Sequence, residues 1–413
     1  VHLWSLDGNL DEPLQAAQQS CGTVLQLVQA LAQQRTITPK LWLVTLDSQA
    51  VQPTDCIRGV VQSTLWGMGK VIALEHPELQ CVRIDLDGQE AFVTQACRLA
   101  AELTAYPIPP SPAGGEGLED QVALRAGIRY VARLARYQNR QPHDPSVTIR
   151  PDATYLITGG LGGLGLEVAR WLVEQGACRL VLMGRTQPKG EAQQQLQALI
   201  ALGARVQVAQ ADVSDYGQVA QVLAQIDSAQ PLAGIIHAAG VAEEACLLTN
   251  KFDWARFTRT LAPKLVGTWN LHSLTKEMPL DFFVAFSSMA SLLGDLGVGL
   301  ADYAAANAFL DAFAHYPRTQ ELTALSINWG IWAKVGMAAV DSVRNQLSQL
   351  EKDGHSLIAP TEGIVAFAHL LGQDVAQVGV APIDWEKFSR QVAHPAFLAE
   401  LISSDRLSST PQN

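Results

Sequence analysis

Short apolar runs alternate along the chain with longer stretches in which apolar positions recur every three or four residues. Two such runs, "TYLITGG" (154–160) and "RLVLMGR" (179–185), enclose "GLEVARWLVEQG" (165–176), which has the period of an amphipathic helix. Near-continuous apolar runs are typical of strands buried on both faces of a parallel sheet. The pattern therefore predicts an α/β fold with a doubly wound parallel sheet. Further strands of this sheet are expected at 205–213, 231–240, 280–288 and 323–330.

The first part of the chain repeats this rhythm more weakly. Strand-like runs occur at 1–6, 41–48 and 79–87, and helix-like stretches occur at 16–34 and 64–76. No strand here is followed by a glycine turn of the T-G-x-x-x-G-x-G type. We therefore expect two Rossmann-like subdomains, of which the first is degenerate and cofactor-free.

Two stretches rich in Pro and Gly or in polar residues, 106–120 and 137–153, have the composition of linkers. The second of them predicts the main division of the chain. We expect a structural subdomain at 1–145, a catalytic nucleotide-binding subdomain at 146–400 and a C-terminal linker at 401–413.

Composition narrows the function classes. The 413 residues carry a net charge of −11 and a sequence pI of about 5.3, which argues against a dedicated nucleic-acid binder. The six cysteines are scattered without a CxxC pair or a Cys/His cluster, so no metal site is expected. No apolar run reaches the roughly 18 residues that span a bilayer. These features predict a cytoplasmic protein with reduced thiols and no membrane partner.

A cluster of five glycines lies at 159–165, between the first strand of the second part and the helix that follows it. Gly160, Gly162 and Gly165 have the G-x-G-x-x-G spacing. Glycines at these positions let the backbone turn tightly and approach a pyrophosphate, which the helix N–H groups then bind. The cluster predicts a dinucleotide-binding turn.

The residue that ends the next strand indicates which nucleotide binds. An acidic residue there would bind the ribose 2′-hydroxyl of NAD, but this chain has Arg185. A guanidinium matches the oxygens of a 2′-phosphate, so NADPH is favoured.

Seven motifs, in order, resemble the ketoreductase domains of modular polyketide synthases, a branch of the short-chain dehydrogenase/reductase superfamily. They are "TGGLGGLG" (158–165), "ADVSD" (211–215), "HAAG" (237–240), "PKLVGTWNLH" (263–272), "FSSMAS" (286–291), "YAAANAFLDAFA" (303–314) and "WGIWAKVGM" (329–337). The resemblance covers essentially the whole chain, including the cofactor-free first half. It implies NADPH-dependent reduction of a β-keto group to a β-hydroxyl.

The resemblance also implies partners and a cofactor-binding set. The substrate would be carried on the phosphopantetheine of an acyl carrier protein, among neighbouring synthase domains. The cofactor-binding residues would be Thr158, Gly159, Gly160, Gly162, Gly163, Leu164, Gly165, Arg185, Asp212, Val213, Ala238, Ala239 and Gly240.

Ketone reduction needs a hydride donor, a group that binds the carbonyl oxygen and a proton source. The resemblance assigns the proton to Tyr303 and the carbonyl contact to Ser288, in preference to Ser287. A free phenol has a pKa of about 10, so a nearby ammonium, Lys264, is needed to lower it. Asn307, one helical turn after Tyr303, would hold a water or orient the lysine.

The sequence departs from the family at two places. Ser288 and Tyr303 are 15 residues apart, a longer separation than the family usually shows, with the excess within 294–302. Glu243 and Glu244 stand where one stereochemical class has Leu-Asp-Asp, so we favour that class. Trp329 and Met337 are expected to line the substrate pocket beneath a lid.

Two alternatives remain. One is another reductase of the superfamily, acting on an α-keto group or on a free small ketone. The other is a domain that only supports the assembly or epimerises its substrate.

Overall fold

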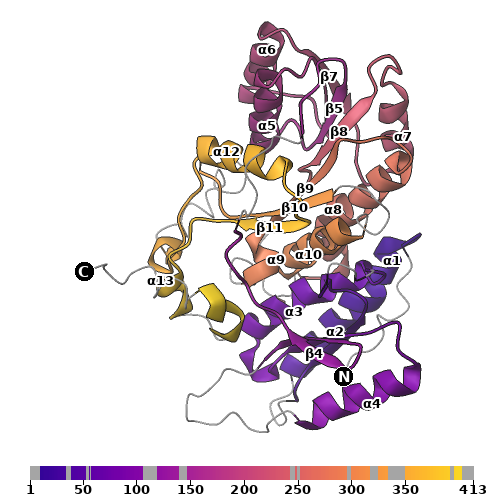
Figure 1. Ribbon diagram of the computed structural model, residues 1–413, viewed down its shortest axis with the longest axis vertical. Helices are drawn as coiled ribbons and strands as arrows, with labels where there is room; N and C mark the ends of the chain where they lie inside the picture. Colours follow the sequence, from indigo (N-terminus) through magenta and orange to yellow (C-terminus); the bar gives the residue numbers. More distant parts are fainter. Residues whose placement is uncertain are drawn as a thin grey trace.

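A computed structural model describes most of the chain and contains two β-sheets (Figure 1). The residues that it describes are 10–33, 39–52, 55, 57–105, 119–138, 147–241, 247–248, 252–294, 299–316, 324–333, 349–390 and 395–401.

The larger sheet has seven strands in the order β11-β10-β9-β8-β5-β6-β7, and every pairing in it is parallel. The strand order reverses between β5 and β8, which are neighbours although two strands separate them in the sequence. Ligands of such sheets bind outside the carboxyl ends of the strands at this reversal. The strands are β5 (Thr154–Thr158), β6 (Arg179–Gly184), β7 (Arg205–Gln210), β8 (Leu232–His237), β9 (Phe282–Ser288), β10 (Ala324–Trp329) and β11 (Gln377–Val380).

Helices cover both faces of this sheet, as the buried apolar runs require. Leu166 and Leu172 of α5 and Phe367 of α12 are among the side chains that pack on one face, which α6 also covers. Val219 and Leu265 pack on the other face, which α7, α8 and α10 cover. The bounds are α5 (Gly163–Glu174), α6 (Glu191–Ala201), α7 (Tyr216–Ala224), α8 (Trp254–Thr275), α10 (Ala301–His315) and α12 (Pro360–Leu371).

The smaller sheet belongs to the first part of the chain and has the order β1-β2-β3-β4. Its first three strands are parallel, and β4 adds an antiparallel edge. Leu99 and Leu103 of α4 pack on one face, and α2 and α3 contribute to the core on the other. The elements are α1 (Pro13–Ala17), α2 (Thr23–Ala32), β1 (Trp42–Leu46), α3 (Thr64–Glu75), β2 (Val82–Leu86), α4 (Phe92–Ala105), β3 (Gln121–Arg125) and β4 (Ile128–Val131).

Two parallel α/β units are therefore confirmed, and the first carries no glycine turn. Each predicted strand from residue 41 onward corresponds to a strand of the model, whereas the run at 1–6 lies outside the described residues. The predicted boundary at 145/146 also falls outside them. Leu401, the first residue of the predicted C-terminal linker, is buried with Phe388 and Leu398.

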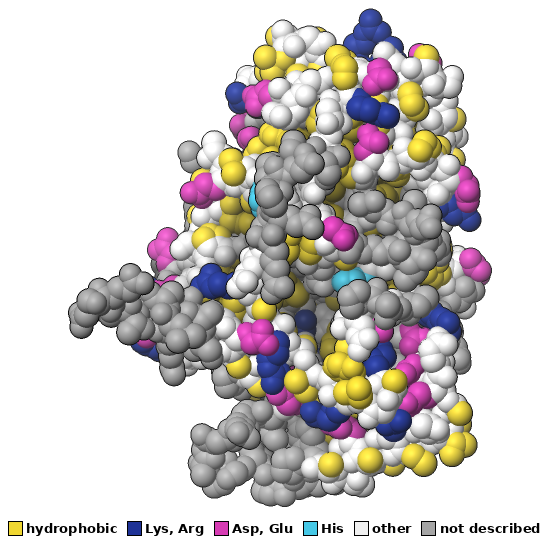
Figure 2. Space-filling view, viewed as in Figure 1, with side chains coloured by type: hydrophobic (Ala, Val, Ile, Leu, Met, Phe, Trp, Pro, Cys, Tyr) yellow, Lys and Arg dark blue, Asp and Glu magenta, His cyan; other side chains and the backbone are white. Residues whose placement is uncertain are grey.

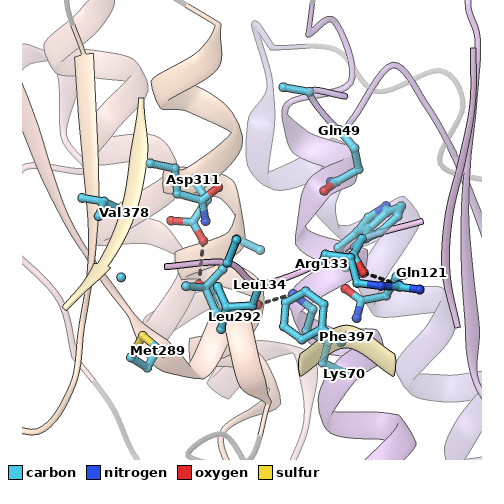
Figure 3. Close-up of a pocket in the computed structure, with 18 of the residues that line it drawn as sticks. Gln49, Lys70, Gln121, Arg133, Leu134, Met289, Leu292, Asp311, Val378 and Phe397 are labelled. Atoms are coloured by element: carbon cyan, nitrogen blue, oxygen red, sulfur yellow. Dashed lines mark hydrogen bonds between the residues drawn. The ribbon is translucent and has the colours of Figure 1, made fainter. Parts of the chain in front are cut away.

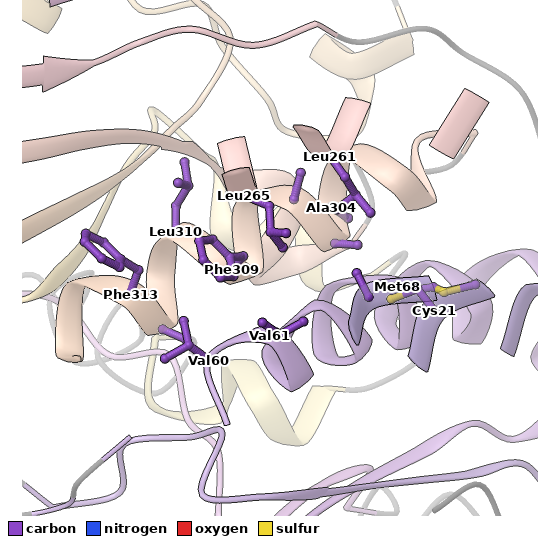
Figure 4. Close-up of a cluster of buried hydrophobic side chains, with 14 of the residues drawn as sticks. Cys21, Val60, Val61, Met68, Leu261, Leu265, Ala304, Phe309, Leu310 and Phe313 are labelled. Carbon is purple, nitrogen blue, oxygen red and sulfur yellow. The ribbon is translucent and has the colours of Figure 1, made fainter. Parts of the chain in front are cut away.

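The two units share one hydrophobic core. Helix α3 of the first unit packs against α10 of the second, and Figure 4 shows Val61 and Met68 facing Ala304 and Phe309 across this contact. The backbones approach so closely that a Cβ on Gly67 would lie 2.1 Å from the carbonyl oxygen of Ala304. The position of α10 is therefore fixed by the first unit as well as by its own sheet.

Charged side chains of both signs are spread over the surface. Figure 2 shows basic and acidic side chains interspersed over the visible face. Among the residues that the model describes, no helix is long and apolar enough to cross a membrane, and no group of His, Cys, Asp and Glu side chains is arranged to bind a metal.

The close approach of α3 and α10 predicts the effect of one methyl group. Gly67→Ala should lower the free energy of unfolding by about 1–3 kcal/mol, because the added Cβ meets rigid backbone. Gly217→Ala is the control, since that Cβ would have only an ordinary contact with Asp215. Urea denaturation of both variants measures the effect, and equal stabilities would contradict the packing argument.

Candidate active site

The glycine turn connects β5 to α5 at the point where the strand order reverses. Gly159 has a φ of +66°, and a Cβ there would lie 2.7 Å from the carbonyl oxygen of Ala238. A Cβ on Gly165 would lie 2.5 Å from the carbonyl oxygen of Gly159. Only glycine fits at these two places, because one needs a left-handed backbone and the other a close backbone approach.

The first turn of α5 meets the requirements of a pyrophosphate site. Gly162 is the N-cap of the helix, and no side chain caps it. The amide groups that follow, from Gly163 and Leu164 onward, are therefore not occupied by a capping side chain. The predicted turn and the helix start thus fit the phosphates of a dinucleotide.

The end of β8 lies directly against this turn. The backbone N–H of Ala238 donates to the carbonyl oxygen of Thr158 at 3.0 Å. The Thr158 hydroxyl is 2.6 Å from Nδ1 of His237. Burial lowers the pKa of His237 to about 3, so this imidazole is neutral. The predicted residues of β5 and β8 therefore form one surface, which continues through Ala239 and Gly240.

The ends of β6 and β7 complete the predicted nucleotide site. The N–H of Gly160 donates to the carbonyl oxygen of Met183 at 3.3 Å, and Arg185 follows two residues later with an exposed side chain. The carboxylate of Asp212 accepts hydrogen bonds from the N–H and the hydroxyl of Ser214, at 2.9 and 2.5 Å. The adjacent residue, Val213, is buried.

Three predicted catalytic side chains meet at the end of β9. Burial raises the pKa of the Tyr303 phenol, and the nearby side chains of Ser288 and Asn307 act in the opposite direction. Ser288 caps α9 (Met289–Leu293) by accepting from the N–H of Ala290 at 3.2 Å, which leaves its hydroxyl hydrogen available to donate. Ser287 instead donates to the carbonyl oxygen of Asn307 at 3.3 Å. This difference supports the choice of Ser288.

Asn307 has one polar atom without a protein partner. Its Nδ2 donates to the backbone oxygen of Tyr303 at 2.8 Å, but its Oδ1 is buried and unpaired. A buried acceptor that lacks a donor costs about 1–3 kcal/mol. A water or a cationic group is therefore expected there.

Lys264 approaches the same place from α8. Its ammonium lies 5.7 Å from the centre of the Tyr303 ring and donates to the carbonyl oxygen of Phe286 at 2.8 Å. Burial lowers the pKa of Lys264 to about 8, and the negative charge of Asp311 acts in the opposite direction. A Cβ on Gly240 would lie 2.9 Å from Cε of Lys264, so this glycine makes room for the lysine chain.

The carboxylate of Asp302 fixes the start of α10. Asp302 is fully buried and accepts from the hydroxyl of Thr260 at 2.8 Å and from the N–H of Tyr303 at 2.8 Å. Its Oδ2 lies 3.9 Å from Nε of Arg256. Burial raises the pKa of Asp302 to about 6. These contacts tie the tyrosine helix to α8, which carries Lys264.

The sequence reading missed a buried polar cluster behind Ser288. Its members lie on β9, α9, α10 and β10, and their side chains hydrogen bond to one another. They are Ser287, Ser291, Asp311, Ser326 and Asn328. One signal was present in the sequence, because Tyr303, Asn307 and Asp311 recur at four-residue intervals on one helix.

The first unit supports two loops beside the site. The carboxylate of Glu75, at the end of α3, accepts from the N–H of Leu247 at 2.9 Å and from the N–H of Gly299 at 2.8 Å. Gln29 of α2 donates to the carbonyl oxygens of Leu247 and Phe252. Gly299, two residues before α10, and Leu247 and Phe252, which follow β8, are thus held by the first unit.

Of the predicted substrate contacts, the structure describes Trp329. Glu243, Glu244 and Met337 lie outside the described residues. Trp329 is 4 % exposed and packs edge-on against Trp332, with ring centres 4.9 Å apart. Its contact with a substrate stays a prediction.

Comparison with known proteins gives this geometry a family. Residues 153–334 match the model of the KR domain, and residues 1–134 match that of the Rossmann fold domain of the polyketide synthase extender module SpnB. An A1-type ketoreductase structure has a TM-score of 0.81 and 34% identity, over 95% of this chain and 79% of that one. The chain belongs to the ketoreductase domains of modular polyketide synthases.

Curated relatives agree with this assignment. Polyketide synthase GfsB of Streptomyces halstedii is 36% identical over 94% of this chain, and the pikromycin synthase component PikAIII of Streptomyces venezuelae is 36% identical over 92%. The ketoreductase domain spans only 7% and 23% of these two proteins. Its homologues thus function among neighbouring synthase domains.

Membership of this family also fixes the class of reaction. The ketoreductase is an oxidoreductase of the short-chain dehydrogenase type, which uses a nicotinamide cofactor. The glycine turn and the uncapped start of α5 fit the phosphates of such a cofactor.

The glycine turn predicts the effect of a methyl group on cofactor binding. Gly165→Ala should weaken binding of the nicotinamide nucleotide at least tenfold, because the Cβ would displace the backbone of Gly159 and Gly160. A fluorescence titration of the nucleotide measures the effect, with Gly217→Ala as the control. Unchanged affinity in Gly165→Ala would show that the turn does not bind the phosphates.

Proposed function

We propose that this ketoreductase uses NADPH to reduce the β-keto group of an intermediate on the phosphopantetheine of an acyl carrier protein. The observation that carries the proposal is the meeting of Tyr303, Ser288 and Lys264 beside the glycine turn. When bound, the cofactor supplies the hydride. The side chains of the chain then have to bind the ketone, orient it and supply a proton.

The two hydroxyl groups have separate roles in this proposal. Ser288 donates a hydrogen bond to the substrate oxygen, because its own oxygen already accepts from Ala290. Tyr303 gives its proton to the same oxygen as negative charge develops there. Burial raises the pKa of Tyr303 and keeps the phenol protonated before reaction.

Lys264 and Asn307 support the proton transfer. The ammonium near the Tyr303 ring stabilises the phenolate that remains after transfer. The free Oδ1 of Asn307 binds a water or the ammonium and so links the site to a proton source. Both residues act on Tyr303, and neither has to contact the ketone.

Arg185 is the basis for proposing NADPH. The side chain is exposed where β6 ends, beside the glycine turn, and the position contains no acid that would favour a free ribose hydroxyl. A guanidinium donates two parallel hydrogen bonds to phosphate oxygens, which makes it a suitable partner for the 2′-phosphate.

One panel of substrates separates the alternatives. Carrier-bound and free thioesters with 3-keto or 2-keto groups are offered with NADPH, and chiral chromatography identifies the products. The proposal expects preferred reduction of the carrier-bound 3-keto substrate. Preference for a 2-keto or free ketone would assign another reductase activity, and lack of turnover with every ketone would assign a non-reducing role. The same products reveal the hydroxyl configuration.

Removal of one hydroxyl tests the proton donor. Tyr303→Phe should reduce kcat by about 10²–10⁴-fold, because the acid is lost, and should leave the Kd of NADPH nearly unchanged. Tyr137→Phe is the matched control, since Tyr137 is exposed and far along the chain from the site. Steady-state kinetics and nucleotide titration measure both effects. Full turnover in Tyr303→Phe would refute the assignment.

A charge reversal tests the nucleotide preference. Arg185→Asp should weaken NADPH binding about 10–100-fold, the loss of a charge-assisted hydrogen bond, and should affect NADH much less. Arg205→Asp makes the same charge change at the opposite end of the strands and should alter neither affinity. Equal losses of NADPH and NADH affinity in Arg185→Asp would remove the 2′-phosphate argument.

A further inference from the structure

Helix α10 carries three polar residues at four-residue intervals. Tyr303 and Asn307 belong to the proposed site, and Asp311 is the next residue on the same face. The side chain of Asp311 is buried, with the residue 7% exposed. It accepts hydrogen bonds from the hydroxyl of Ser291 at 2.6 Å and from the hydroxyl of Ser326 at 2.7 Å.

This carboxylate is connected to the strand end that carries Ser288. Nδ2 of Asn328 lies 2.9 Å from Oδ1 of Asp311 and 3.2 Å from the carbonyl oxygen of Ser288. The hydroxyl of Ser291 lies 2.8 Å from the same carbonyl oxygen. The amide of Asn328, which has two hydrogens to donate, therefore bridges Asp311 to the backbone of Ser288, and the single hydroxyl hydrogen of Ser291 lies within reach of both acceptors.

The charge of Asp311 acts on two lysines, Lys264, which is buried, and Lys70, which is partly buried. Burial lowers the pKa of both Lys264 and Lys70 to about 8, and the charge of Asp311 raises both. Lys70 belongs to α3 of the first unit and donates to the carbonyl oxygen of Ser291 at 2.6 Å. Figure 3 shows Lys70 and Asp311 on facing walls of a cleft of about 1140 Å³ between the units.

Burial raises the pKa of Asp311 itself, and the hydrogen bonds from Ser291, Ser326 and Asn328 act in the opposite direction and favour the charged form. Lys70 also responds to Arg83 and Asp120, and His315 lines the same cleft as Asp311. Lys264 faces the Tyr303 ring and His237, which is neutral because burial lowers its pKa to about 3. Within the described part of the chain, the acidic side chain that acts on Lys264 is Asp311.

We propose that Asp311 is a positioning residue of the ketoreductase: its carboxylate ties the helix that carries Tyr303 to the strand end that carries Ser288, and it supplies the buried negative charge that Lys264 and Lys70 share. The proposal rests on the proposed role of Lys264 in reduction. It explains how Ser288 and Tyr303 stay paired although 15 residues separate them in the sequence. It also explains how Lys264, which no described carboxylate contacts directly, stays protonated at neutral pH.

Asp311→Asn tests this by removing the charge while keeping the shape. The ammonium of Lys264 exists below its pKa, and Asp311 raises that pKa. The alkaline limb of the kcat–pH profile should therefore move to lower pH by roughly one unit. NMR titration of ¹⁵N-lysine-labelled protein should show the same shift for the Lys264 amine. That second readout does not need turnover, so it stands even if the proposed reduction fails.

Two control variants assign the effect. Asp227→Asn makes the same change on an exposed residue and should leave the limb in place. Lys70→Met should also leave it in place, because Lys264 and not Lys70 governs the limb. If Asp311→Asn does not fold, the double variant Asp311→Asn/Lys70→Met is compared with Lys70→Met alone, since one ammonium fewer is then left uncompensated near the buried cluster.

The outcomes are decisive in both directions. The proposal is supported if the alkaline limb of the kcat–pH profile and the pKa of Lys264 both move to lower pH in the Asp311 variant while both controls are unchanged. An unchanged Lys264 titration in a folded Asp311→Asn protein would overturn it. A limb that moves in Lys70→Met but not in Asp311→Asn would overturn it as well.

Discussion

Helix α10 is packed from two sides, and the geometry of the site depends on that packing. Its apolar side chains contact α3 of the first unit, where Gly67 lets the two backbones touch. Its polar face points at the end of β9, where Ser288 lies. A shift of the helix by a fraction of an ångström would separate the phenol from the serine. The packing at Gly67, which leaves no room for a methyl group, and the buried hydrogen bonds of Asp311 both resist such a shift.

This arrangement gives the cofactor-free unit a physical purpose. It has no glycine turn, yet it supplies the helix that packs on α10 and the carboxylate of Glu75 that binds both loops beside the site. Lys70 of the first unit also donates a hydrogen bond to the backbone of the buried polar cluster. The first unit thus acts as a rigid support. The combined match of both halves to polyketide synthase models agrees with this joint role.

Much of the fold was predictable because buried parallel strands leave a strong apolar signal. The strands β5 to β10 were expected from that signal, and the glycine turn followed from spacing alone. The edge strands β11 and β4 were not expected, since short edge strands are half exposed and carry little pattern. Strand β3 was missed as well, although all five of its residues are buried. The resemblance named Tyr303, Ser288 and Lys264, but Asp311 and Asn328 were missed. Their partners are far away in the sequence, and only the fold shows that they are bonded.

The most direct test of this account is the structure of the ketoreductase with its nicotinamide nucleotide and an inert substrate analogue bound. The account predicts that the nicotinamide ring lies beside Tyr303, with the hydride-bearing carbon and the phenol oxygen each about 3–3.5 Å from the two ends of one carbonyl group. Ser288 would contact the same oxygen. A nucleotide bound elsewhere, or a ring too far from the phenol for both transfers to reach one carbonyl, would contradict the account.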